Sequence, residues 1–432
     1  VVCAPPAWIS DQHGRSRRTV AWTVVTSTLK CLRPTLSVML RRSLPSIKRE
    51  AFQRRNIHRA LPPTMKAWRT HKFGNLQELA LEETALPQLR SPNDILVKVH
   101  ATSVNPLDVA MMEGYGRNVI DVLRSMQHFP YTSPRFPLIL GRDFSGQVVS
   151  VGQGVKHFRV DDEVWGATMA GHEGSHAEYI AVSSNIISHK PKTLPHLESA
   201  SFPYASLTAW AAIKTVGNMS RSNADKKRCL VIGGSGGVGT FAIQLLKTWN
   251  ANVTATCQPD AVDLLSRLGA DSLMDYTAPD FVQQLKASER FDFILDCVGG
   301  LSFAPKLLRK GKLAPYVSIV SPVLKNTDKH GLIQGFVLSA CHAAQTTIKE
   351  LLEGRSVRWA FFYPNAKALK EIATKIDSGK ISPVVHEMFS FEDMRTAYQR
   401  VKDGHLRGKN VVAVEQVQEK HPARFVTHEV KE

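Results

Sequence analysis

The stretch from Leu230 to Lys247, LVIGGSGGVGTFAIQLLK, carries three glycines, Gly234, Gly236 and Gly239, with the spacing G-x-G-x-x-G. Glycines let a backbone approach a diphosphate closely, and the start of a helix offers free N–H groups with partial positive charge. An apolar run precedes these glycines and an apolar run with helical spacing follows them, which is the setting that a dinucleotide-binding turn requires. The alternative is a packing turn without a ligand. The strands and helices that alternate downstream favour the binding site.

The residue that follows the second strand of such a unit indicates which nicotinamide cofactor is bound. An NAD site usually carries an acidic residue about 20 positions past the glycines, whereas here that position is the neutral Gln258. Asp260 is two residues further on, in a less suitable loop position. Because a carboxylate would repel a 2′-phosphate, its absence at this position favours NADPH. Tyr276 and Arg267 are candidate partners of that phosphate, and the alternative is a surface arginine and a half-buried tyrosine.

The chain around this turn divides into a β-rich half and an α/β half. Residues 94–105 and 145–155 cluster β-branched residues between glycines and polar breaks, and this pattern continues to about residue 182. It predicts short antiparallel strands. After Pro203 apolar residues recur at helical spacing, and then apolar strands alternate with helices. Because those strands lack polar alternation, we predict a doubly wound α/β sheet with helices on both faces, and we expect the tail to rejoin the first half.

One long connection, residues 114–137, interrupts the β-rich half. It contains glycines, prolines and aromatic residues. A mobile flap over a pocket and a plain surface excursion both fit this composition.

The positive charge of the chain is concentrated near its start. Of a formal net charge of +17, the first 64 residues contribute +10, from twelve Lys or Arg against Asp11 and Glu50. An Arg-rich, acid-poor segment of this kind is typical of a mitochondrial presequence, and a disordered basic tail is the alternative. We expect residues 1–38, which precede the first methionine, to lie outside the functional protein. The remaining charge is ordinary for a body of this size, so no nucleic-acid partner is expected.

Cysteine and histidine spacing does not suggest a metal centre or a disulfide framework. The six cysteines show no C-x-x-C spacing, which argues for a reducing compartment. His172 and His176 are four residues apart, but a glycine between them disfavours a helix that presents both to a metal.

A series of motifs carries a family resemblance. In chain order they are VNPLDV, FPLILGRDFSG, DDEVWGA, LPHLESASFPYASLTAWAAI, GGSGGVGTFAIQ, LGADSLMDY, FDFILDCVGG, VRWAFF and GHLRGKNVV. With these motifs, residues 65 to about 414 resemble the zinc-free quinone oxidoreductase branch of the medium-chain dehydrogenase/reductase family. The resemblance implies a leader at 1–64, a GroES-like catalytic domain at 65–200 that 366–432 rejoins, and a Rossmann NADP(H)-binding domain at 201–365.

The resemblance also implies roles for particular residues. Asn105 and Asp108 would line the nicotinamide end as the catalytic residues. The remaining set would bind the cofactor, from the diphosphate to the adenosine and ribose: Ser235, Gly236, Gly237, Val238, Gln258, Tyr276, Cys297, Val298, Gly299, Phe361, Phe362, Arg407, Gly408 and Lys409. A turn cap is the alternative for Asp108, and a plain core position is the alternative for the two phenylalanines.

No catalytic zinc is expected. Zinc enzymes of this family carry a cysteine where this chain has Asn105, and a His-Glu pair where it has Arg142 and Asp143. Asparagine and arginine cannot replace a thiolate and an imidazole on zinc. Without a metal, the chemistry that remains is hydride transfer from NADPH to an acceptor that tolerates added electrons, such as a quinone or a conjugated enone.

Three hypotheses follow. The first is an NADPH-dependent quinone or enone reductase of the mitochondrial matrix, which the resemblance links to ubiquinone biosynthesis and to reticulon-4 as a partner. The second is a 2-enoyl thioester reductase, for which Tyr115 would be the candidate acid. The third is a reticulon-binding protein that binds NADPH without significant turnover. Association with the outer membrane and a homodimer are left open.

Overall fold

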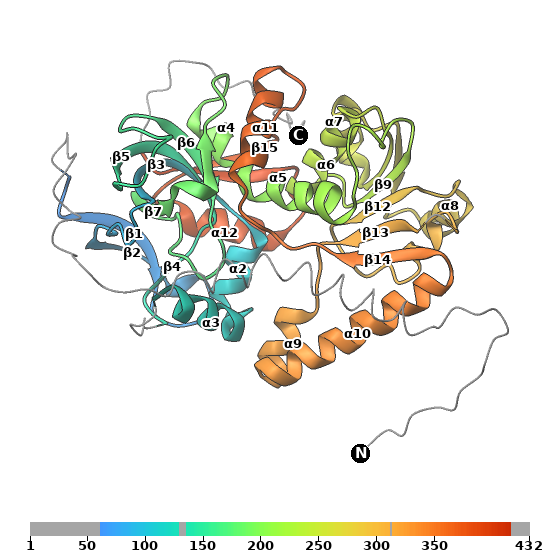
Figure 1. The fold of residues 1–432 in the computed structure, drawn as a ribbon, viewed down its shortest axis with the longest axis horizontal. Coiled ribbons are helices and arrows are strands. Elements are labelled where there is room, and N and C mark those ends of the chain that lie inside the picture. Colours follow the sequence, from blue (N-terminus) through green and yellow to red (C-terminus); the bar gives the residue numbers. More distant parts are fainter. Residues whose placement is uncertain (1–60, 129–134, 312, 416–432) are drawn as a thin grey trace. The chain divides into compact units, whose positions relative to one another are not determined.

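The computed structural model of the chain describes residues 61–128, 135–311 and 313–415. The expected leader, residues 1–64, lies outside these ranges up to residue 60. The described residues build a β-rich lobe and an α/β lobe (Figure 1). No helix among them is long and apolar enough to cross a membrane.

The β-rich lobe is built around β3 (Asp94–Val104), which pairs with β5 (Asp143–Val151), β7 (Tyr179–Ser183) and β16 (Lys409–Ala413), all antiparallel. Its main sheet has the order β15-β16-β3-β5-β6-β8, with β7 attached to β3, and a smaller sheet has the order β2-β1-β4. The other elements are β1 (Thr64–Thr70), β2 (Leu79–Ala85), α2 (Pro106–Met112), α3 (Arg117–His128), β4 (Leu138–Ile139), β6 (Glu163–Ala167), β8 (Ile187–His189), α4 (His196–Ala200), α12 (Met394–Asp403) and β15 (Val385–Ser390).

The α/β lobe contains six parallel strands in the order β11-β10-β9-β12-β13-β14. The strand order reverses between β9 (Arg228–Ile232) and β12 (Phe293–Asp296), and ligands of open α/β sheets bind at such a reversal. The other elements are α5 (Pro203–Trp210), α6 (Gly237–Lys247), β10 (Asn252–Cys257), α7 (Val262–Arg267), β11 (Ser272–Asp275), α8 (Phe281–Ala287), β13 (Ala314–Ser318), α9 (Val323–His330), α10 (Leu332–Leu352), β14 (Arg355–Trp359) and α11 (Ala366–Asp377).

The predicted doubly wound sheet is confirmed, and the apolar composition of its strands has the expected cause. The residues of β12 are all buried, and Leu230 and Val231 of β9 are fully buried. Helices therefore cover both faces of the central strands. Because neither face meets water, these strands do not alternate polar and apolar residues. Figure 1 shows α5 and α6 above this sheet and α9 and α10 below it.

The tail crosses back to the first lobe. β16 pairs with β3 from Asn410 opposite Val104 to Ala413 opposite Ala101. Just before this strand, Gly408 donates its N–H to the carbonyl oxygen of Ser235 at 2.9 Å. The tail therefore places residues 407–409 directly against the glycine-rich turn.

Candidate functional site

The glycine-rich turn lies between β9 and α6, and its glycines have different roles. A Cβ on Gly239 would come within 2.2 Å of the carbonyl oxygen of Gly233, so this position needs glycine for the strand and helix to pack. A Cβ on Gly236 would meet no atom within 4 Å. The first helical hydrogen bond joins the N–H of Thr240 to the oxygen of Gly236, so the amide of Val238 precedes the intrahelical bonds and is available to a ligand. The turn fits a diphosphate at Gly236.

Arg407 lies at the adenosine side of this turn. Its guanidinium donates to both carboxylate oxygens of Asp260 at 2.6 and 2.7 Å, to Oε1 of Gln258 at 2.9 Å and to Oγ of Ser235 at 3.3 Å. The Arg407 side chain is 7% exposed, whereas that of Asp260 is 66% exposed. Burial raises the pKa of Tyr276, and Arg407 opposes this effect, which places the phenol in the same electrostatic environment. A cation therefore lies among the residues expected to bind the adenosine ribose.

A buried polar cluster lies at the junction of the two lobes. Asp143 accepts hydrogen bonds from Ser103 Oγ at 2.6 Å, Asn105 Nδ2 at 2.9 Å and the Tyr204 N–H at 2.5 Å. The ammonium of Lys409 donates to Asn105 Oδ1 and lies 3.5 Å from Asp143 Oδ2. All of these side chains except that of Tyr204 are buried. Charge is therefore balanced inside the cluster by one lysine and one carboxylate.

Lys409 connects this cluster to the turn. A Cβ on Gly237 would come within 2.9 Å of Lys409 Cδ, so the lysine stem lies against the first residue of α6. Burial lowers the pKa of Lys409, and Asp143 and Asp108 only partly oppose that effect. The lysine therefore loses its proton more readily than an exposed lysine.

Asp108 is a buried cap of α2. Its Oδ2 accepts from the Asn105 N–H at 2.8 Å, and its Oδ1 accepts from the Gly141 N–H at 3.1 Å and lies 3.4 Å from Arg142 Nε. Asp108 is fully buried and its contacts position Asn105. This geometry matches the turn-cap alternative, in which Asp108 acts through its neighbour.

Other predicted site residues follow β12 and β14 of the α/β lobe. The ring of Phe362 stacks on Tyr204 with centroids 4.2 Å apart, whereas Phe361 is 57% exposed. After β12, the carboxylate of Asp296 accepts from the N–H groups of Val298 at 2.9 Å and Gly299 at 2.8 Å. This carboxylate therefore holds the loop that contains Cys297. Burial raises the pKa of the Cys297 thiol, so the thiol stays protonated.

The comparisons with known proteins agree with this geometry. Residues 91–192 match the alcohol dehydrogenase GroES-like domain, and residues 268–412 match the zinc-binding dehydrogenase family. The chain is 43% identical over 380 residues to "NAD(P)H oxidoreductase RTN4IP1, mitochondrial" of Danio rerio, which covers 87% of this chain and 98% of that protein. The human protein of the same name is 43% identical over 353 residues, 81% of this chain and 89% of that one.

The chain belongs to the medium-chain dehydrogenase/reductase family. A protein of Caenorhabditis elegans named "Reticulon-4-interacting protein 1, mitochondrial" is 36% identical over 352 residues, 81% of this chain and 95% of that protein. Among solved structures, the quinone oxidoreductase of Coxiella burnetii superimposes with a TM-score of 0.67 at 27% identity, over 82% of this chain and all of that one. The predicted family and its two-part fold, a GroES-like domain with a Rossmann-like parallel sheet, are confirmed.

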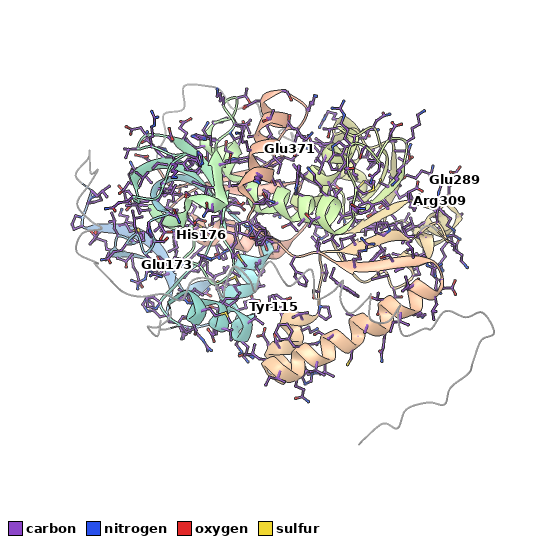
Figure 2. All side chains as sticks on the ribbon, in the orientation of Figure 1. Tyr115, Glu173, His176, Glu289, Arg309 and Glu371 are labelled. Atoms are coloured by element: carbon purple, nitrogen blue, oxygen red, sulfur yellow. The ribbon has the colours of Figure 1, made fainter. Side chains whose placement is uncertain are left out.

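The zinc positions of this family have other contacts here. Arg142 is fully buried and donates from Nη1 to the carbonyl oxygen of Met169 at 2.6 Å, and its Nη2 has no hydrogen-bond partner among the described residues. His176 lies in the first lobe (Figure 2), where its ring contacts Tyr398 and the backbone of Ser103. Burial lowers the pKa of His176, which keeps it neutral. In the described part of the chain, no three His, Cys, Asp or Glu side chains are grouped as a metal site.

Sequence reasoning considered Asp260 a less suitable candidate and missed Tyr204. Asp260 stands in a loop position that the sequence pattern disfavours, yet it is the main partner of Arg407. Tyr204 stands out only as part of a longer motif, yet its amide binds Asp143 and its ring packs on Phe362. Arg267, the other candidate for a 2′-phosphate, is an exposed residue at the end of α7.

Proposed function

We propose that the chain is a metal-independent, NADPH-dependent reductase that transfers hydride to a quinone or a conjugated enone. The observation that carries this proposal is the position of Lys409, whose stem packs on Gly237 and whose ammonium contacts Asn105 and Asp143. One side chain therefore connects the turn suited to a diphosphate with a buried polar cluster. The names of relatives, NAD(P)H oxidoreductase and quinone oxidoreductase, support the same interpretation.

The residues around the turn would hold the cofactor along its length. The amides at the start of α6 and the open side of Gly236 suit the diphosphate, and Arg407 with Gln258 and Tyr276 suits the 2′-phosphate of the adenosine ribose. The loop at Cys297 to Gly299 and the ring of Phe362 would bind the nicotinamide half. Reduced nicotinamide supplies a hydride, which brings two electrons and one proton to the acceptor.

In this proposal the polar cluster donates the second proton of the reaction. Reduction of a quinone to a hydroquinone needs one hydride and one further proton, which must reach the acceptor oxygen. An ammonium has three hydrogens. Among the described residues, Lys409 donates two of these hydrogens, one to Asn105 Oδ1 and one to Asp143 Oδ2. Because burial lowers its pKa, Lys409 is a better acid near neutral pH than an exposed lysine. We assign it the role of proton donor.

Asn105 and Asp143 act as positioning residues in this scheme. Their oxygens fix the ammonium, and the Asp143 carboxylate stabilises its charged form. Asp108 in turn fixes Asn105 through two hydrogen bonds, at 2.8 and 3.1 Å. Since a quinone delocalises the added charge over its ring and oxygens, this cluster needs no metal to polarise the acceptor.

The cellular setting is part of the same proposal. Several relatives are named mitochondrial, and one is named a reticulon-4-interacting protein. The basic segment before residue 65 is interpreted as a presequence that directs the chain to the matrix. By the family resemblance we extend the proposal to a role in ubiquinone biosynthesis and to binding of reticulon-4.

NADPH oxidation by the purified chain tests the reaction. Short-chain ubiquinone and a crotonyl thioester would be offered as separate acceptors. Turnover with the quinone alone supports the proposal, turnover with the thioester alone supports enoyl reduction through a tyrosine such as Tyr115, and NADPH binding with neither supports an interaction protein. Tyr115 precedes α3 and lies beside α9 (Figure 2), where burial and then Asp328 raise its pKa.

Replacement of the proton donor tests the mechanism. Lys409→Met should lower kcat and remove the loss of kcat that the wild-type chain shows as pH rises through the lowered lysine pKa. Lys402→Met is the matched control, since Lys402 is exposed and pairs with Glu113 outside the cluster. An unchanged pH profile in Lys409→Met would show that another group delivers the proton.

A further inference from the structure

A buried arginine beside the polar cluster makes fewer hydrogen bonds than its side chain allows. Arg142 is fully buried and stands directly before β5, next to Asp143. Its Nη1 donates to the carbonyl oxygen of Met169 at 2.6 Å, whereas Nε and Nη2 have no hydrogen-bond partner among the described residues. A buried donor without a partner is costly, and more so on a charged group. A cation kept at this cost points to a role beyond packing.

The carboxylate that faces this guanidinium belongs to Asp108. Its Oδ1 lies 3.4 Å from Arg142 Nε, and both side chains are fully buried. The other carboxylate oxygen, Oδ2, accepts from the N–H and the Nδ2 of Asn105 at 2.8 and 3.1 Å. Asn105 Oδ1 in turn accepts from the ammonium of Lys409. A continuous series of polar contacts therefore joins Arg142 to the group that we assign as proton donor.

Once Asp108 is included, the charges around the cluster balance only with Arg142. Asp108 and Asp143 supply two buried carboxylates, and Lys409 and Arg142 supply two buried cations. A guanidinium stays charged in proteins, whereas a buried ammonium can lose its proton. If Arg142 were absent, two carboxylates would act on one lysine and would hold its proton more tightly.

The other titratable groups that Arg142 influences do not change this balance. Burial lowers the pKa of His176 and raises the pKa values of Tyr204 and Tyr398, so all three side chains are uncharged near neutral pH. Burial also lowers the pKa of Arg124 of α3, and two nearby carboxylates oppose that effect more strongly than Arg142 adds to it. Arg124 therefore belongs to a separate set of charges.

We propose that Arg142 is a positioning residue whose fixed positive charge offsets the Asp108 carboxylate and so sets how readily Lys409 releases its proton. This inference rests on the proposed role of Lys409. When Lys409 donates, an N–H bond of the ammonium breaks, its electron pair stays on nitrogen, and an O–H bond forms on the acceptor. The cluster then keeps one uncompensated carboxylate, whereas without Arg142 it would keep two.

A purely structural ion pair is the alternative, and the α/β lobe contains one for comparison. Arg355 Nε donates to the carboxylate of Glu350 at 2.7 Å, and both side chains are buried. This distance is typical of a charge-assisted hydrogen bond. The Arg142 Nε lies 3.4 Å from Asp108 and makes no hydrogen bond with it. The Arg142 pair is therefore poorly built as a structural link, but its charge still acts at this distance.

An NMR titration of the full chain, with isotope-labelled lysine Cε and Lys409→Met to assign the signal, measures the effect directly. Arg142→Met should raise the titration midpoint of Lys409 by about one pH unit, a tenfold change in its acid dissociation constant. Asp108→Asn should lower the midpoint, because Arg142 then acts unopposed. The double variant Arg142→Met/Asp108→Asn and the charge-conserving Arg142→Lys should both titrate near the wild type.

Arg355→Met is the matched control, since it breaks a buried arginine–carboxylate pair away from the cluster and should leave the Lys409 midpoint unchanged. In the quinone assay, the pH at which kcat falls should follow the midpoint in each variant. A midpoint that moves as expected while kcat does not follow would refute the proton-donor role of Lys409 and leave the role of Arg142 standing.

Three results would overturn the inference. One is a Lys409 midpoint that stays unchanged or falls in Arg142→Met. Another is a shift in Arg142→Lys as large as that in Arg142→Met, which would assign the effect to the shape of the guanidinium. The third is a double variant that keeps the full shift of Arg142→Met, which would mean that the cluster had rearranged. If Arg142→Met does not fold, Asp108→Asn, Arg142→Lys and the double variant decide by the same expected order.

Discussion

The pair formed by Arg407 and Asp260 makes a quantitative prediction about cofactor preference. If Arg407 binds the 2′-phosphate, Arg407→Met removes charge-assisted hydrogen bonds of about 1.5–3 kcal/mol, which is roughly a 10- to 150-fold rise in Kd for NADPH. The Kd for NADH, which lacks that phosphate, should change little. Asp260 competes for the same guanidinium, but its side chain is 66% exposed, so their pair stabilises by only about 0.2–1 kcal/mol. Asp260→Asn should therefore strengthen NADPH binding by a factor of about 1.4 to 5.

Titration of NADPH and NADH by quenching of tryptophan fluorescence at one fixed salt concentration measures these changes. Arg267→Met is the matched control, because this exposed arginine is the other candidate for the phosphate. Equal losses of NADPH and NADH in Arg407→Met would refute the reasoning, since they would mean that Arg407 only holds Ser235 and Gln258 in place. A selective loss of NADPH in Arg267→Met would move the phosphate site to α7.

Two further predictions follow from the burial of particular positions. Gly236→Ala should keep the wild-type melting temperature, because its Cβ meets no atom within 4 Å, and should weaken NADPH binding in a direct titration because the methyl group enters the space assigned to the diphosphate. Burial lowers the pKa of His196 to about 4, so the unfolded chain binds more protons than the folded chain below pH 6.5 and stability falls as pH falls. This group alone contributes about 2 kcal/mol to the difference between urea titrations at pH 7 and 5, and His196→Gln should reduce the difference by that amount. Other buried histidines with lowered pKa, such as His176, keep their own contribution.

The fold was largely predictable because its strongest signals are local. Apolar strands such as β9 and the glycine turn before α6 have short-range patterns that the structure reproduces. The long connection at 114–137 has the composition of an irregular segment but contains α3, and α10 was not predicted at all. α10 does not show the usual amphipathic pattern, because its buried positions are Gly335, Ser339 and Glu350, whereas apolar residues such as Ile333 and Leu352 are exposed.

The site was less predictable, because it depends on contacts between residues far apart in the chain. Asn105 and Lys409 are joined by a hydrogen bond that no spacing rule indicates. Asp260 lies close in sequence to the position where an NAD site carries an acid, but its role is visible only once the tail brings Arg407 beside it. A family resemblance supplied Arg407, Lys409 and Asn105 as candidates, but it did not supply the contacts that join them or the part played by Asp260 and Asp143.

The tail segment at 407–409 reaches two separate parts of the candidate site. Gly408 has a φ of 84° and donates to the Ser235 oxygen, and a Cβ there would come within 2.1 Å of the Val384 oxygen. Only glycine fits this conformation so close to backbone, and the bend lets the residues on either side diverge. Arg407 consequently reaches Gln258, while Lys409 reaches Asn105. In the proposed function, Arg407 binds the 2′-phosphate and Lys409 delivers the proton, and both depend on the same bend at Gly408. A change in this segment should therefore affect cofactor affinity and turnover together.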